Sequence, residues 1–188
     1  MNNDFKLITG VEVELSDKIK SAYTENDDGF EAVVSAEKIS QLVGSFTALL
    51  DEPVFFFLEL PKNAEENDMG YDVYYLDNCT LPVAKAIMKR YGELLVQDGM
   101  SRFGFGSHSS NEEIYVMDYQ QVSIYCHDKK KTSALLGDLG IERVDKLHTM
   151  WEGFSEDSPG ICMRVDVNGE NVFDIPENLK SEGMYKAQ

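Results

Sequence analysis

The residues most suited to chemistry stand in the run GFGSHSSN, which spans positions 104–111. Its serines and His108 supply the residue types of an activated nucleophile, a hydroxyl beside a base. The chain has no GxSxG motif, however, and residues this close in sequence rarely form a catalytic triad. We therefore predict no catalytic residue, and the Ser107–Asn111 loop with His108 stands as the alternative, a site for an enzyme or a small ligand.

Gly104, Phe105 and Gly106 also begin like the glycine-rich fingerprint of dinucleotide-binding folds. Ser109 stands where the third glycine is needed. The residues that follow predict strands, whereas phosphate binding in that fingerprint requires a helix N-terminus. The sequence thus predicts no phosphate-binding loop and no cofactor.

Histidine spacing gives no sign of a metal site. His108, His127 and His148 show neither i, i+4 nor HxH spacing. Cys126 and His127 are adjacent, but neighbours on a strand point to opposite faces, so one ion cannot easily bind both. We predict that the chain binds no metal.

Composition limits the class of partner. The chain has 188 residues, 43% of them apolar, which is enough for one domain over residues 1–188. Its 17 Lys and Arg against 34 Asp and Glu give a net charge of -17. Such a surface repels nucleic acid and anionic lipid and steers a basic protein partner toward it. The alternative is that this excess of acidic residues only keeps the protein soluble. The sequence gives no indication of oligomeric state.

Two further features predict a cytoplasmic protein. The N-terminal run MNNDFKLITG has no basic segment followed by an apolar one, and nowhere do 18 apolar residues occur in succession. The three cysteines are an odd number at wide spacings, so a disulfide framework is not expected.

Periodicity predicts the elements that position these residues. Apolar residues three and four apart predict helices over 36–51 and 81–97, and Asp128 begins a third helix that ends near Gly140. The run VFFFLEL from Val54 predicts a central strand covered on both faces. Residues 112–117 and 121–126 predict a hairpin joined through Asp118, Tyr119 and Gln120.

The predicted fold is α+β, with two main helices packed on an antiparallel or mixed sheet. The strands of that sheet are expected near residues 54, 71, 101, 112, 121, 161 and 172, the last two joined by a turn at Asn168 and Gly169. Weaker strand signals occur over residues 5–15 and 30–34. The polar run over residues 24–29 predicts a solvated loop.

Aromatic residues close to carboxylates are the remaining candidates for function. Tyr and Trp are enriched in interface hot spots, and carboxylates pair with a basic partner. Each aromatic, the single Trp above all, has core packing as its alternative. Pairs such as Glu65 and Glu66 are too common in this chain to indicate acid–base catalysis. The predicted partner-binding residues are Glu112, Glu113, Asp118 and Tyr119 on the hairpin, and Trp151, Glu152, Glu156 and Asp157 on a later loop.

The succession of LLVQDGMSRFGFGS, NEEIYVMDYQQVSIYCHD, LLGDLGI and LHTMWEGFSEDSPGICMRVDVNG resembles the bacterial immunity proteins, small acidic proteins encoded beside polymorphic and contact-dependent toxins. The resemblance covers residues 54–185 and rests on overall pattern, with no invariant motif. It implies a non-catalytic inhibitor that binds a cognate toxin domain, often a nuclease. Because immunity families use different surfaces, it assigns no residue. A regulatory interaction module is the third alternative.

Overall fold

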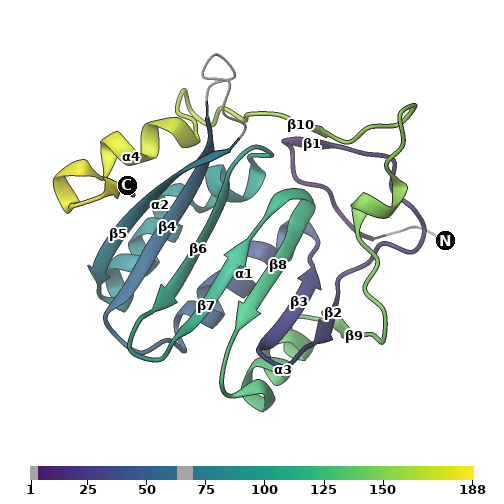
Figure 1. Ribbon diagram of the computed structural model, residues 1–188, viewed down its shortest axis with the longest axis horizontal. Helices are drawn as coiled ribbons and strands as arrows, with labels where there is room; N and C mark the ends of the chain where they lie inside the picture. Colours follow the sequence, from purple (N-terminus) through teal and green to yellow (C-terminus); the bar gives the residue numbers. More distant parts are fainter. Residues whose placement is uncertain (1–3, 63–69) are drawn as a thin grey trace.

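A nine-stranded sheet organises residues 4–62 and 70–188, which are those that this computed structural model describes (Figure 1). Every neighbouring pair of strands is antiparallel except β2 with β9. The spatial order is β11 (Tyr185–Lys186), β5 (Tyr71–Cys79), β4 (Val54–Pro61), β6 (Arg102–Ser107), β7 (Glu112–Val116), β8 (Gln121–Tyr125), β3 (Gly29–Val33), β2 (Ala22–Glu25) and β9 (Glu142–Arg143). The α+β class predicted from the sequence is confirmed.

Helices cover one face of this sheet (Figure 1). The two main ones are α1 (Ala36–Thr47) and α2 (Leu81–Gln97), so both predicted helices are confirmed, although α1 ends at Thr47 and not at residue 51. Side chains alternate between the two faces of each strand, and the apolar faces of both helices pack on those that point toward them. These strand residues are fully buried: Phe56, Leu58, Phe103, Phe105 and Ile114.

The third helix, α3 (Lys129–Asp138), begins and ends as predicted. The Asp128 side chain accepts a hydrogen bond from the backbone N–H of Lys131. Past its end, Gly140 has a φ of 63°, and the N–H of Ile141 donates to the carbonyl of Leu136 at 3.0 Å. This is the Schellman arrangement, which satisfies the last carbonyls of the helix.

In the part of the chain that the structure describes, no helix covers the opposite face, which we call the open face (Figure 1). The β4 strand is central and buried on both faces, as predicted, although helices cover only one of them. Phe55 and Phe57 point to the open face, yet they are only 6% and 5% exposed. Glycines explain this, because a Cβ on Gly104 or Gly106 would lie 2.4 Å from the Cζ of Phe57 or Phe55. The rings lie across β6 where side chains are missing.

Several expectations for the chain ends are corrected. β10 (Ile161–Cys162) pairs with β1 (Val11–Glu12) in a separate two-stranded sheet and does not join the main one. Only those two residues of the weak strand signal over residues 5–15 form a strand. The predicted loop over residues 24–29 is shortened, because β2 extends to Glu25 and β3 starts at Gly29.

The predicted strand near residue 172 is a 3-10 turn, Val172–Asp174, followed by α4 (Ile175–Asn178). Asn171 and Asp174 form a capping box, a helix-start signal that outweighs the apolar alternation here. The turn before it is confirmed, with φ of 54° at Asn168 and 83° at Gly169, but it closes a single bridge. Glu65 and Glu66 lie outside the described residues, as does most of the acidic segment between β4 and β5.

Candidate functional site

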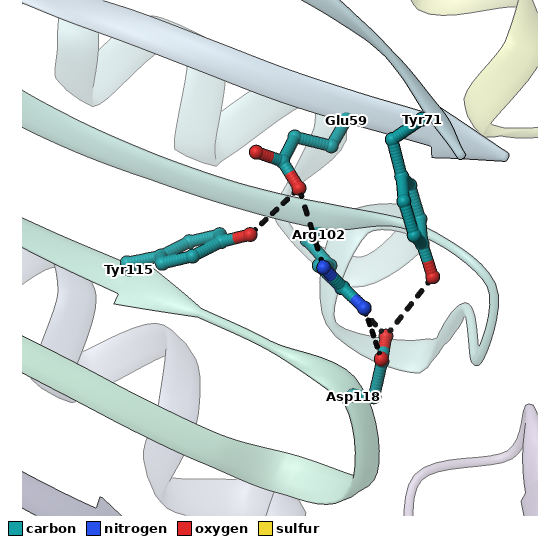
Figure 2. A network of polar contacts seen from close by, with 5 residues as sticks. All are labelled: Glu59, Tyr71, Arg102, Tyr115 and Asp118. Carbon is teal, nitrogen blue, oxygen red and sulfur yellow. Dashed lines mark hydrogen bonds and ion pairs between the residues drawn. The ribbon is translucent and has the colours of Figure 1, made fainter.

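One end of the open face carries a polar network around Arg102 (Figure 2). The Arg102 guanidinium donates to both carboxylate oxygens of Asp118, with Nε at 3.0 Å from Oδ1. Its Nη1 lies 3.7 Å from Oε2 of Glu59, which also accepts a 2.6 Å hydrogen bond from the Tyr115 hydroxyl. The Arg102 Cζ lies 4.0 Å from the centroid of the Tyr71 ring. A single cation thus satisfies two carboxylates and stacks on an aromatic ring.

The electrostatics of this network favour its charged form. Hydrogen bonding to Asp118 raises the pKa of Arg102, against the opposing effect of burial. Burial first, and then the hydrogen bond to Glu59, raises the pKa of the Tyr115 hydroxyl, which therefore stays protonated and donates. Because the charges and hydrogen bonds of these groups are satisfied within the network, this end of the open face serves to stabilise the fold.

A cleft of about 500 Å³ lies at the other end of the same strands. Aromatic rings and acidic groups from five strands and from the turn after β6 form it, and we call it the aromatic–acidic cleft. Its lining residues are Phe55, Tyr75, Asp77, Ser107, His108, Asn111, Glu112, Glu113, Tyr125 and Tyr185.

Glu113 is the acidic group that points to the open face within this cleft. It lies opposite Gly106 on β6 and Tyr125 on β8. Burial raises the pKa of its carboxyl, and the negative charge of Glu59 raises it further. Among the residues that the structure describes, no lysine, arginine or histidine forms an ion pair with Glu113. A partly desolvated carboxylate without a cation disfavours its own charged form.

The mouth of the cleft is built from His108, Asp77 and Tyr185. The His108 ring stacks on Phe55 with centroids 4.4 Å apart and an interplanar angle of 23°. Its Nε2 lies 3.9 Å from Oδ1 of Asp77, while the Tyr185 hydroxyl donates to Oδ2 of Asp77 at 2.6 Å. The side chain of His108 is 79% exposed, so the imidazole covers the cleft without being buried in it.

Ser107, one of the serines that the sequence offers as a nucleophile, is buried at the end of β6, where the turn begins. Ser107 is 1% exposed, and its Oγ accepts hydrogen bonds from the backbone N–H groups of Ser109 and Ser110. The His127 ring, at Nε2, lies 2.8 Å from the carbonyl oxygen of Ser110 and not from a serine hydroxyl. These serines shape the turn between β6 and β7, as expected for a polar connection.

The predicted hairpin residues divide between the two ends of the open face. Glu112 and Glu113 begin β7 and line the cleft, and Glu112 also accepts a 2.9 Å hydrogen bond from the His127 N–H. Asp118 follows the far end of β7 and is bound to Arg102. Tyr119 is 7% exposed, and burial first, then a hydrogen bond to Cys162, raises its pKa.

The predicted loop residues lie beside the β7–β8 turn. Trp151 is 49% exposed, so core packing does not account for it. Its ring contacts Tyr119 edge-on with centroids 4.6 Å apart, and Phe154 completes the cluster. The sequence predicts Tyr119 and Trp151 as binding residues on two separate segments, and the structure brings their rings into contact.

The carboxylates after Trp151 differ in their contacts. Glu152 pairs with His148 at 2.7 Å and with Lys146 at 3.7 Å, and the His148 bond lowers its pKa. Glu156 and Asp157 are exposed. None of these three lines the aromatic–acidic cleft.

Sequence reasoning missed Asp77, Phe55, Tyr75 and Tyr185 as site residues. Alternation along β5 places Tyr71, Val73 and Tyr75 on one face, and this pattern is the signal that could have identified Tyr75. Tyr185 comes from the last strand, more than 100 residues away from Asp77, and no local pattern relates them.

Comparisons with known proteins give limited relationships. No family model matches the chain, and no solved structure matches it. It is similar to two proteins named “Putative ribose-phosphate pyrophosphokinase 2”, from Streptococcus pneumoniae serotype 4 strain TIGR4 and from strain R6. Each is 28% identical over 149 residues, which are 75% of this chain and 42% of the relative. The chain therefore spans less than half the length of these curated relatives. No described helix is both long and apolar enough to cross a membrane.

Proposed function

We propose that this chain is a cytoplasmic, non-catalytic immunity protein of bacteria, which neutralises a toxin by binding a basic segment of it in the aromatic–acidic cleft. The observation that carries the proposal is Glu113. Its carboxylate is partly desolvated beside aromatic rings, its pKa is raised by burial, and no cation pairs with it in the described chain. A basic side chain from a partner would supply the missing charge.

The rest of the cleft fits the same role. Tyr75, Tyr125 and Tyr185 provide amphipathic rings of the type that anchors protein interfaces, and Tyr125 and Tyr185 are half exposed. The net charge of -17 would accelerate encounter with a basic domain, an effect that weakens with salt. Trp151 lies outside this cleft, so within the proposal it contributes at the edge of the interface.

A small-ligand or enzymatic role is the second candidate, favoured by the volume of the cleft, which falls in the range of ligand pockets. The name of the S. pneumoniae relatives would make that ligand a phosphate compound. Asp77, Glu112 and Glu113 would repel phosphate, and Ser107 is held by two backbone donors, so we rank this role second.

The test asks whether a gene next to this one encodes a basic toxin domain and mixes that domain with the full chain. Stopped-flow fluorescence measures the association rate, and calorimetry measures the dissociation constant. We expect a one-to-one complex with the full chain. E113Q is expected to weaken it by about tenfold, because a charge-assisted hydrogen bond is lost. E93Q makes the same substitution at an exposed position of α2, behind the sheet, and should leave affinity unchanged.

Two outcomes would overturn the proposal. If the neighbouring gene product forms no complex with the full chain, the immunity function is wrong. If a complex forms and E113Q and E93Q bind alike, the cleft is not the binding site.

A further inference from the structure

We infer that the aromatic–acidic cleft is a receptor for one arginine side chain, supplied by the partner. The inference rests on the proposed function in one respect only, which is that a toxin supplies the arginine. The specificity for a guanidinium is derived from the way in which the chain binds its own arginine, Arg102, on the same face of the same sheet (Figure 2).

Tyrosines and carboxylates stand at both ends of the open face. On β5, Tyr71 stacks under Arg102, and Tyr75 stands four residues further along, on the same face of the strand. The Arg102 site has two carboxylates, Asp118 and Glu59, within reach of one cation. The cleft is lined by three, Asp77, Glu112 and Glu113.

A main difference between the two ends lies on β6. Gly106 stands four residues after Arg102 on the same face, so the cleft has acceptors and rings but no side chain in place of the arginine. The ring of Phe55 lies over Gly106, where a Cβ would be 2.4 Å from its Cζ. The glycine therefore provides an aromatic floor for the cleft in place of a cation.

His108 indicates how a planar cation would lie on that floor. Its imidazole is nearly parallel to the Phe55 ring at 4.4 Å and faces Asp77 at 3.9 Å. Ring stacking combined with an adjacent carboxylate is the arrangement of Arg102 between Tyr71 and Asp118. Because His108 is 79% exposed, an incoming guanidinium could displace it and lose little buried contact.

The groups present favour arginine over lysine. A guanidinium is planar, so it can stack on an aromatic ring of the cleft while its separate N–H groups donate to a lining carboxylate such as Glu113. A lysine ammonium is a compact charge that is more strongly hydrated than a guanidinium. Moving it from water to a partly desolvated carboxylate therefore costs more free energy. An uncharged isostere of arginine would leave Glu113 without its cation.

The experiment titrates the full-length chain, without any partner, with argininamide, lysinamide and citrullinamide in turn, and follows backbone amides by NMR. We expect argininamide to shift the amides around Tyr75, Glu113 and Tyr125 with a millimolar dissociation constant. Lysinamide should bind more weakly, and citrullinamide, which lacks the charge, should give no saturable shift. E113Q should weaken argininamide binding by about tenfold. E93Q should not change it.

The inference is overturned if citrullinamide binds as well as argininamide, if the shifts map to the Trp151 cluster, or if E113Q binds argininamide like the parent. These outcomes are independent of the toxin. Argininamide binding without a complex with the neighbouring toxin domain would refute the proposed function alone, whereas a toxin complex that E113Q weakens, from a chain that does not bind argininamide, would refute the arginine site alone.

Discussion

The two ends of the open face use the same kinds of residues for opposite purposes. At one end, Arg102 lies between Asp118 and Glu59 and stacks on Tyr71, so every charge has a partner within the chain. At the other end, Gly106 stands on β6 opposite Glu113, and Glu113 lines the cleft together with three tyrosines. A satisfied network stabilises the fold, whereas unsatisfied acceptors raise its free energy until a partner arrives. Stability and binding are thus separated along a single set of strands.

The largest effect that tests this separation is expected from R102M. It leaves Asp118 and Glu59 without their cation while keeping a side chain of similar length. We expect a loss of about 3 kcal/mol in the free energy of unfolding, since breaking a largely buried ion pair leaves uncompensated charge. Urea denaturation measures it.

The matched variant is the double substitution R102M/D118N, which removes one of the stranded charges and should recover about 1 kcal/mol. Argininamide binding should be unchanged in both variants. If R102M costs less than about 1 kcal/mol, the network resembles an exposed ion pair and the two ends do not differ as described.

A second, smaller effect is expected from G106A, which probes the floor of the cleft. The added Cβ would lie 2.4 Å from the Phe55 Cζ and 2.9 Å from its Cε1, so the ring must move. Overpacking of this kind costs about 1–3 kcal/mol, and the displaced ring should also weaken argininamide binding.

G44A is its control, because a Cβ on Gly44 in α1 meets no atom within 4 Å. It should stabilise the protein by up to about 1 kcal/mol through helix propensity. The melting temperatures of G106A and G44A, measured by thermal unfolding, test whether the two substitutions have opposite effects. Equal effects of the two substitutions would mean that Phe55 does not depend on Gly106.

The sequence predicted the parts of this comparison that depend on local pattern. Helical spacing located α1 and α2, the continuous apolar run VFFFLEL located β4, and short strand patterns located β5 to β8. It did not predict that β4 has an open face, since rings lying over glycines make both faces of VFFFLEL apolar. Which side of a sheet the helices cover is decided by packing over the whole chain.

The candidate site was predictable only in part, for a geometric reason. Glu112 and Glu113 were predicted together with Asp118 because they share a hairpin, yet these groups lie at opposite ends of β7. A five-residue strand separates its ends by about 16 Å. Asp77 and Tyr185 reach the cleft through the pairing of β11 with β5, which no local pattern reveals.

The smallest effect is expected from E113Q on stability, and its sign depends on pH. Burial raises the pKa of Glu113 above its ordinary value of 4.5, so the folded chain holds this proton at pH values where the unfolded chain has released it. The stability of the parent therefore falls as the pH rises above that value. Glutamine cannot ionise, so E113Q should melt higher than the parent at pH 7, by no more than about 4 °C, and the difference should vanish below pH 4.5.

Saturating argininamide should reverse that order. A bound cation stabilises the ionised form of Glu113, as Arg102 stabilises Asp118, so at pH 7 the liganded parent should gain melting temperature while E113Q gains little. E93Q, which removes one exposed charge from α2, controls for net charge. If the parent and E113Q melt alike at pH 7 with and without argininamide, then Glu113 is an ordinary surface carboxylate. Ionised Glu113 would then not destabilise the folded chain, so a cationic partner would gain nothing by neutralising it. The two ends of the open face would differ only in shape.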